Sequence, residues 1–332
     1  MDTTITKIIN KALDGTIISD DELKKLFQLE DYSEEAAMMR HASRVFSRDT
    51  FGQCEVSGQI GLDNYPCAAN CKFCSFAPCN ACFDKDDIGQ LDPEDVVDRA
   101  TFMVEEGATS IFLMTTATLK FEDLLEVAKV VKPAIGDIPM VVNTADFDLD
   151  QAKELKKVGF AGAYHVIRMG EERDNVLKVA DRWKTIENAK EAGLFLSTCV
   201  EPIGPEHSID ELVEKTVFTR EMAPVHSGAM RRTAVPGSAL YEYGQISYAR
   251  LANIVAAVNL ATGPDIANCT HNPNMPGVMA GANLFWAEAG ANPRDTEAET
   301  SGQQGEGVAA CINIFEEAGA EVNKGKTKIF LA

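Results

Sequence analysis

Long apolar runs are missing from this sequence. No stretch approaches the ~18–20 consecutive apolar residues that a membrane-spanning helix requires, and the first residues lack the pattern of a signal peptide. Internal repeats, low-complexity tracts and proline-rich linkers are also missing, so nothing indicates a second large domain. These absences predict a cytoplasmic protein that has no membrane-embedded part.

Basic residues are scarce. The 332 residues include 31 Lys and Arg against 51 Asp and Glu, which gives a formal net charge of −20. This balance argues against nucleic acid or an anionic membrane as a partner. With 45% hydrophobic residues, the chain is long enough for one α/β barrel of about 250 residues with extensions at its ends.

Cysteine, in contrast, is concentrated in one place. Five of the nine cysteines fall within residues 67–82. Cys67, Cys71 and Cys74 are spaced C-x3-C-x2-C, and Cys79 and Cys82 follow as a C-x2-C pair. Thiolates are the soft ligands of iron–sulfur clusters, and three of them on a four-iron cluster leave one iron open for a small molecule.

Zinc binding, disulfide formation and a redox-active C-x2-C pair are the alternatives to an iron–sulfur cluster for residues 67–82. Zinc bound by Cys71, Cys74, Cys79 and Cys82 would leave Cys67 without a role, and the gap between the two pairs is short for a zinc site. Disulfides require an oxidising compartment, and a thioredoxin-like C-x2-C pair would stand alone at the start of a helix. The spacing therefore favours an iron–sulfur cluster.

This stretch resembles the cluster loop of the radical S-adenosylmethionine (SAM) enzymes. The chain is most similar to their biotin-synthase-like branch, which includes archaeal-type lipoyl synthases, methylornithine synthase and the maturases of hydrogenase cofactors. The resemblance implies a 4Fe–4S cluster on Cys67, Cys71 and Cys74, with SAM chelating the fourth iron and Phe73 beside it. One electron, from a ferredoxin- or flavodoxin-type reductant, then cleaves SAM to a 5′-deoxyadenosyl radical that abstracts hydrogen from an unactivated carbon.

Hydrophobic periodicity predicts the fold. Residues 1–50 read as a helical N-terminal extension, with helices over 5–13, from 20 onward, and over 34–46. From residue 51 strands and helices alternate. Strands are predicted at 54–60, 109–116, 139–144, 162–168, 195–200, 227–232, 266–269 and 283–287, and helices at 92–106, 124–131, 149–158, 173–192, 209–222 and 248–262. Eight apolar strands alternating with helices predict a single (β/α)8 TIM-type barrel over residues 51–332.

In such a barrel the functional residues lie at the carboxyl ends of the strands, and polar side chains concentrate there. By resemblance to the family, the SAM-binding residues are Phe73, Thr115, Thr116, Arg168, Glu171, Glu172, Gly204 and Glu206. The remaining polar residues at these ends are candidates for substrate binding: Asn143, His165, Arg231, Arg232, His271 and Asn272. A surface or salt-bridge role is the alternative for each residue taken alone.

The other cysteines bear on the reaction. We expect Cys79 and Cys82 to bind a second, auxiliary iron–sulfur cluster, together with Cys199 or Cys269. Cys199 matches the strand-five cysteine that holds the second cluster of biotin synthase, but the biotin synthase cysteines on strands two and three are absent here. Cys54 and Cys311 are interpreted as small buried hydrophobic residues.

The leading functional hypothesis is sulfur insertion into an aliphatic carbon, as in lipoyl or biotin synthases. The alternative is a cofactor maturase or carbon-skeleton rearrangement enzyme that inserts no sulfur. A third possibility is a non-catalytic zinc- or cluster-binding scaffold, for which an open coordination site would serve no purpose. The substrate is expected to be a small molecule, free or bound to a carrier protein, and a partner subunit is a further possibility.

Overall fold

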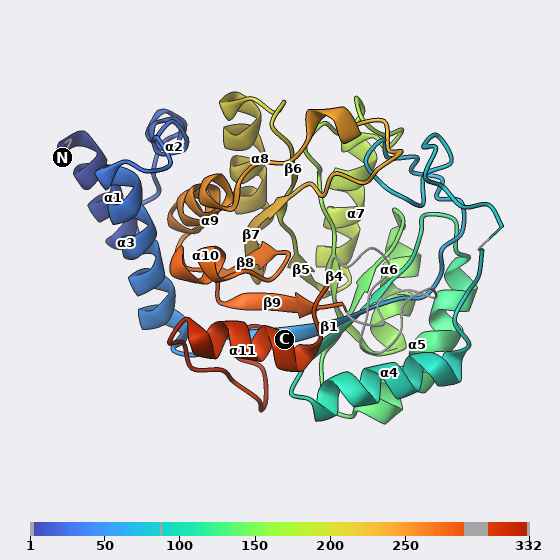
Figure 1. Ribbon diagram of the computed structural model, residues 1–332. Helices are drawn as coiled ribbons and strands as arrows, with labels where there is room; N and C mark the ends of the chain where they lie inside the picture. Colours follow the sequence, from blue (N-terminus) through green and yellow to red (C-terminus); the bar gives the residue numbers. More distant parts are fainter. Residues whose placement is uncertain (1–2, 87, 289–304, 331–332) are drawn as a thin grey trace.

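The computed structural model describes residues 3–86, 88–288 and 305–330. Its centre is a single parallel sheet (Figure 1). The strand segments of the described residues are β1 (Glu55–Gly61), β2 (Ser110–Met114), β3 (Met140–Asn143), β4 (Phe160–Tyr164), β5 (Phe195–Ser197), β6 (Val200–Ile203), β7 (His226–Arg231), β8 (Ala267–His271) and β9 (Leu284–Ala287).

The sheet closes into a barrel. Strand β1 pairs with both β2 and β9, and β7 pairs with both β5 and β6. Segments β5 and β6 therefore form one barrel strand that is interrupted at Thr198 and Cys199. Nine segments, two of which share one position, make eight barrel strands in the described residues. The predicted (β/α)8 barrel is confirmed.

Helices surround the barrel. The described residues contain α4 (Pro93–Glu105), α5 (Phe121–Ile135), α6 (Leu149–Lys157), α7 (Val179–Glu191), α8 (Ile209–Met222), α9 (Tyr248–Thr262), α10 (Met275–Met279) and α11 (Val308–Glu317), with a short 3₁₀ helix at Tyr241–Tyr243. Local sequence sets several of their starts: Asp148 and Ser208 each form a capping box, which satisfies backbone N–H groups that lack partners within the helix. The sequence did not predict α10 and α11.

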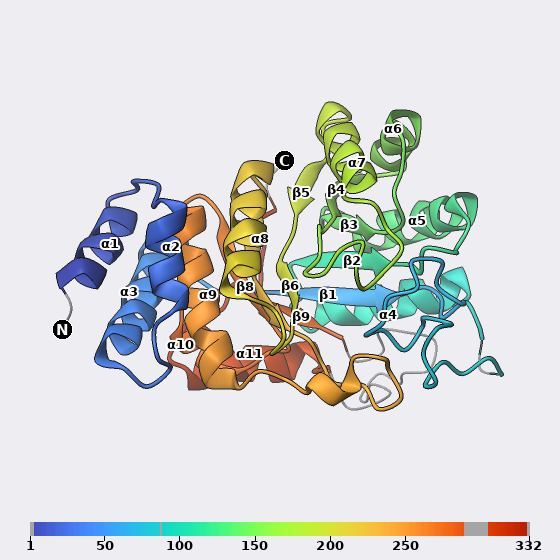
Figure 2. The same cartoon turned by 90° about the horizontal axis from the view of Figure 1, so that it is seen from above.

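The N-terminal helices α1 (Thr3–Leu13), α2 (Asp20–Phe27) and α3 (Glu34–Phe51) lie outside the barrel helices. Helix α3 packs on α9, and α2 packs on α8 and α9, on the opposite side of the molecule from α4 and α5 (Figure 2). The boundary between this extension and the barrel at residue 50 stays a prediction. None of the helices that the structure describes has the length and apolar character to cross a membrane.

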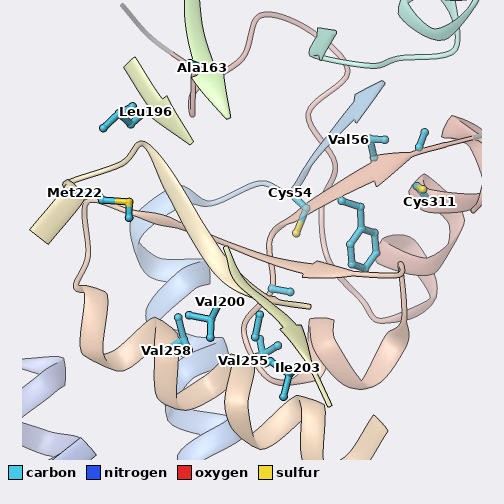
Figure 3. Packing of buried hydrophobic residues seen from close by; sticks show 14 of the residues in the cluster. Cys54, Val56, Ala163, Leu196, Val200, Ile203, Met222, Val255, Val258 and Cys311 are labelled. Carbon is cyan, nitrogen blue, oxygen red and sulfur yellow. The ribbon is translucent and has the colours of Figure 1, made fainter. Parts of the chain in front are cut away.

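The hydrophobic core has two parts. The outer part lies between strands and helices, where Val200 and Ile203 of β6 face Val255 and Val258 of α9 (Figure 3). Burying each such side chain is worth roughly 1.5–3 kcal/mol. Cys54 and Cys311 are buried in this part, as predicted. The inner part fills the barrel itself and comprises Phe112, Val141, Cys199, Ala267, Cys269, Leu284, Trp286, Ile329 and Phe330.

The chain after β4 differs from the prediction. Strand β4 ends at Tyr164, not at Arg168, and α7 begins at Val179, not at Arg173. The intervening residues turn sharply, because Gly170 and Glu172 both have positive φ angles (68° and 66°). A side chain on Gly170 would meet the Asp174 carboxylate 2.1 Å away, so this turn requires glycine at that position.

Candidate functional site

A cavity of about 830 Å³ opens at the carboxyl ends of the barrel strands. Its walls combine the loop after β1 with side chains from strand ends all around the barrel. The loop contributes Cys67, Ala69, Cys71, Phe73, Cys74, Ser75 and Phe76, and the strands contribute Gln59, Met114, Asn143, Tyr164, Met230, His271 and Trp286, among others. The volume is that of a small-molecule site.

The three closely spaced cysteines share one wall of this cavity. The Cys67 sulfur accepts a hydrogen bond from the Ala117 backbone N–H at 3.3 Å, and the Cys74 sulfur accepts one from the Phe76 N–H at 3.5 Å. Burial raises the pKa of Cys71 to about 11 and that of Cys74 to about 12 in the protein alone. Binding as thiolates therefore requires positive charge in the cavity, which the irons of a cluster supply.

Backbone contacts hold the loop in place. The Asn80 side-chain amide donates to the carbonyls of Cys71 (3.1 Å) and Cys74 (2.8 Å), and the Cys67 N–H donates to the Phe76 carbonyl at 2.8 Å. Asn70 adopts a positive φ of 49°, and its side chain accepts from the Cys79 N–H at 3.0 Å. The turn thus directs three cysteines to one side.

These residues fit a cluster better than a single metal ion. No group of three His, Cys, Asp or Glu side chains within the described residues converges as the ligands of one ion would. The ligands of a four-iron cluster are further apart, because each cysteine binds a different iron. Cys79 is exposed and its sulfur contacts the Asn70 carbonyl at 3.7 Å, whereas Cys71 is buried. In the described residues, the four cysteines of the zinc site considered above therefore do not converge on one point.

Half of the residues predicted to bind SAM reach the cavity: Phe73, Thr115, Thr116 and Arg168. Arg168 lies 3.9 Å from the Glu201 carboxylate. Of the others, Glu171 accepts a hydrogen bond from the Arg168 N–H at 2.6 Å and supports that residue from behind.

Glu172, Gly204 and Glu206 do not line the cavity. Glu172 accepts a hydrogen bond from the Val179 N–H at 3.2 Å. Glu206 forms a two-pronged ion pair with Arg232, and the backbone N–H of Gly204 donates to His207 Nδ1 at 2.9 Å.

Two of the six predicted substrate residues, Asn143 and His271, line the cavity. His271 Nε2 lies 2.9 Å from the Glu288 carboxylate, which raises the pKa of His271 although burial opposes the shift. Arg232 is occupied by Glu206, and Arg231 lies over the Tyr248 ring at 3.6 Å. The Asn272 carbonyl accepts from the Asn274 side chain at 2.7 Å.

His165 is buried behind the wall. It lies 3.0 Å from Asp146, which also accepts from Arg182 at 3.0 Å. Burial and the charge of Arg182 lower the pKa of His165 to about 3, so this histidine is neutral. Burial alone would raise the pKa of Asp146, but the His165 hydrogen bond and the Arg182 charge outweigh it and lower this pKa to about 2.

The four cysteines expected to bind a second cluster do not share the cavity wall. Cys199 lines it, and Cys269 lies behind with its sulfur 3.8 Å from that of Cys199. Cys79 and Cys82 do not line the cavity. Cys82 lies against Gly237, since a Cβ added to Gly237 would be 3.0 Å from the backbone nitrogen of Cys82. Their role as ligands stays a prediction.

Sequence reasoning missed several cavity residues: Gln59, Asp63, Tyr164, Arg182 and Trp286. The Tyr164 hydroxyl donates to Glu201 at 2.7 Å, and the Gln59 side chain donates to Glu288. The signal that could have found Gln59 is a polar residue at an alternate position within an apolar strand. Tyr164 ends a strand and Asp63 lies two residues after one, so both are near strand ends. Arg182 comes from the interior of a helix and carries no such signal.

The fold and this loop define a class: a closed parallel barrel with a three-cysteine loop over its mouth is the architecture of a radical SAM domain. Residues 65–217 match the family described as the Radical SAM superfamily. A biotin synthase from Aliarcobacter butzleri (strain RM4018) is 28% identical over 156 residues, which cover 44% of this chain and 53% of that protein. The chain thus matches about half the length of this curated relative.

Solved structures share the fold over nearly the whole chain. Methylornithine synthase superposes with a TM-score of 0.81 at 16% identity, covering 95% of this chain and 97% of that one. The FeFe-hydrogenase maturase HydG from Carboxydothermus hydrogenoformans gives 0.76 at 20% identity, covering 95% and 78%. Residues 65–217 therefore match a radical SAM domain, and 156 residues of the chain are similar to a biotin synthase.

Proposed function

We propose that this protein is a radical SAM enzyme that abstracts hydrogen from an unactivated carbon of a small or carrier-bound substrate. A 4Fe–4S cluster and SAM, when bound, supply the one-electron cleavage that generates the abstracting radical. The observation that carries the proposal is the position of Cys67, Cys71 and Cys74 on one wall of a closed-barrel cavity of small-molecule size. The reductant is expected to be a one-electron donor of the ferredoxin or flavodoxin type.

The chain's own residues bind and orient in this proposal. Cys67, Cys71 and Cys74 hold three irons, and N–H groups of Ala117 and Phe76 stabilise the negative charge on two of the sulfurs. Arg168 presents a cation to the carboxylate of SAM, and Glu201 and Glu171 keep Arg168 in place. The apolar side chains of Phe73, Met230 and Trp286, among others, keep bulk water away from the reacting carbon.

Sulfur insertion of the lipoyl or biotin synthase type is the finer form of this proposal. It is supported by the biotin synthase relative and by Cys199 in the cavity wall. It requires an auxiliary iron–sulfur cluster. The second candidate is a cofactor-maturase or rearrangement reaction without sulfur insertion, which is favoured by Met114 and Asn143 on strands two and three, where biotin synthase has cysteines.

Iron and sulfide analysis of anaerobically purified protein tests the cluster. The triple variant Cys67→Ala/Cys71→Ala/Cys74→Ala is expected to lose one 4Fe–4S cluster and to form no 5′-deoxyadenosine from SAM with dithionite. The matched control is Cys311→Ala, which changes a buried cysteine outside the cavity. Zinc in place of iron, or full SAM cleavage in the triple variant, would reject the proposal.

The same analysis separates the two finer forms. Sulfur insertion predicts a second cluster whose iron is lost in the Cys79→Ala/Cys82→Ala variant, while the first cluster remains. A single cluster that is unchanged in this variant favours the reaction without sulfur insertion.

A further inference from the structure

The barrel interior contains a pair of thiols to which the reaction without sulfur insertion gives no role. The sulfurs of Cys199 and Cys269 are 3.8 Å apart, and both residues are almost completely buried, with exposed fractions of 3% and 0%. Cys199 lies at the break between β5 and β6, and Cys269 lies on β8. Of the two, Cys199 is the one that reaches the cavity.

A glycine on the intervening strand packs closely against the backbone of Cys269. Strand β7 runs between β6 and β8, and its Gly228 pairs with Cys269. A side chain on Gly228 would start 2.0 Å from the Cys269 carbonyl oxygen, and the φ angle of 149° also disfavours any other residue. Glycine at this position therefore lets β7 lie close to the backbone of β8 at Cys269.

The surroundings of the pair are apolar. Both cysteines belong to the apolar cluster inside the barrel. Among the residues that the structure describes, no third Cys, His, Asp or Glu joins the pair in a metal-binding arrangement. Two S–H groups next to a cavity are suited to hydrogen-atom transfer, since an S–H bond is weaker than an aliphatic C–H bond.

We propose that Cys199 donates a hydrogen atom to a carbon-centred radical in the cavity and that Cys269 restores it; this inference rests on the proposed function. The Cys199 S–H bond breaks, a C–H bond forms, and a sulfur-centred radical remains on Cys199. Cys269 passes its hydrogen atom to Cys199 across the 3.8 Å contact. A one-electron donor of the iron–sulfur or flavin class then supplies an electron and solvent supplies a proton, so that Cys269 is again a thiol. In the net reaction, the carbon-centred radical, one electron and one proton combine to form a C–H bond, and both cysteines return to the thiol form.

Solvent deuterium tests the donor without an identified substrate. Thiol hydrogens exchange with deuterium oxide, so 5′-deoxyadenosine formed from SAM and dithionite in this solvent is expected to carry deuterium. The quantity measured by mass spectrometry is deuterium per molecule of 5′-deoxyadenosine, which is independent of the amount formed. Cys199→Ala is expected to reduce it to natural abundance. Cys311→Ala, which changes a buried cysteine outside the cavity, is the matched control and is expected to retain it.

Three outcomes would overturn the inference. Deuterium retained in Cys199→Ala would exclude this thiol, and deuterium lost in Tyr164→Phe but kept in Cys199→Ala would assign the donor to the Tyr164 hydroxyl. Absence of 5′-deoxyadenosine from the wild-type protein would reject the proposed function and this inference with it, so the two failures are distinguishable.

Infrared spectroscopy gives a readout that needs neither cluster nor SAM. The S–H stretching band of Cys199 is expected to shift in Cys269→Ala, because the sulfur–sulfur contact is lost. An unshifted band would show that the two thiols do not interact, and it would overturn the restoring role of Cys269. This result does not depend on whether Cys199→Ala forms 5′-deoxyadenosine.

Discussion

The carboxylate of Asp63 accepts two hydrogen bonds from Thr116, one from the backbone N–H at 2.9 Å and one from the hydroxyl at 2.5 Å. Asp63 follows β1 and Thr116 follows β2, so this contact joins two strand ends directly below the cysteine loop. A third hydrogen bond, from the Tyr65 N–H at 3.2 Å, fixes the first turn of the loop. One buried carboxylate therefore anchors the start of the cysteine loop.

Asp63→Ala is expected to lower the free energy of unfolding by about 1–3 kcal/mol, because it leaves buried donors of Thr116 without an acceptor. Asp63→Ala and Thr116→Val form a double-mutant cycle, measured by urea denaturation. The changes that the two substitutions make in the free energy of unfolding are expected not to be additive. Asp84→Ala, at an exposed position of the same loop, is the control. Additive effects of Asp63→Ala and Thr116→Val would contradict the pairing.

Arg168→Ala is expected to weaken SAM binding by about ten-fold or more, since a charge-assisted contact is worth roughly 1.5–3 kcal/mol. The measurement is calorimetric titration of the protein with its cluster assembled. Arg173→Ala is the matched control, because Arg173 forms ion pairs with Asp174 and Glu211 outside the cavity. Equal SAM affinity in wild type and Arg168→Ala would give Arg168 a structural role only.

Gly228→Ala is expected to reduce the free energy of unfolding by about 3 kcal/mol or more, because the new Cβ overlaps the backbone of Cys269. Gly193→Ala separates this clash from backbone strain. Gly193 also has a positive φ, 76°, but nothing lies within 4 Å of the point that a Cβ on this residue would occupy, so a loss of only about 1–2 kcal/mol is expected. Similar losses in both variants would show that the contact between Gly228 of β7 and Cys269 of β8 is not tight.

His226 makes stability fall in acid. It is fully buried against Phe112, Trp286 and Phe330, and burial lowers the pKa of His226 to about 3. The unfolded chain takes up a proton near pH 6.5, whereas the folded protein does not. The unfolding free energy therefore decreases by up to about 1.4 kcal/mol per pH unit below that point.

In His226→Leu, the unfolding free energy is expected to fall less steeply between about pH 6 and pH 4, by up to about 1.4 kcal/mol per pH unit. The measurement is denaturant unfolding at a series of pH values. His165 contributes in the same direction and remains in the variant. His41→Leu, at an exposed position on α3, is the control. An unchanged slope in His226→Leu would contradict the assignment.

Much of the architecture follows from local sequence. The barrel strands are short apolar runs, helices end at glycines such as Gly107 and Gly193 with positive φ, and both signals depend only on neighbouring residues. The spacing of Cys67, Cys71 and Cys74 is local as well, because one turn of the chain places all three on one side. These features could be predicted before any tertiary structure was known.

The rest of the site depends on contacts between distant segments. Arg232 follows a strand end, as a substrate-binding residue would, but Glu206, 26 residues earlier in the chain, occupies its guanidinium. Arg182 reaches the cavity from the interior of α7, which no strand-end pattern indicates.

The sequence alone determined that three cysteines form one loop and that eight strands alternate with helices. Only the tertiary structure decided which side chains share the cavity, because strand register sets the direction of each residue. The approach of Cys199 to Cys269 is the clearest case. It requires two strands to lie on either side of a third, and the two cysteines are 70 positions apart in the chain.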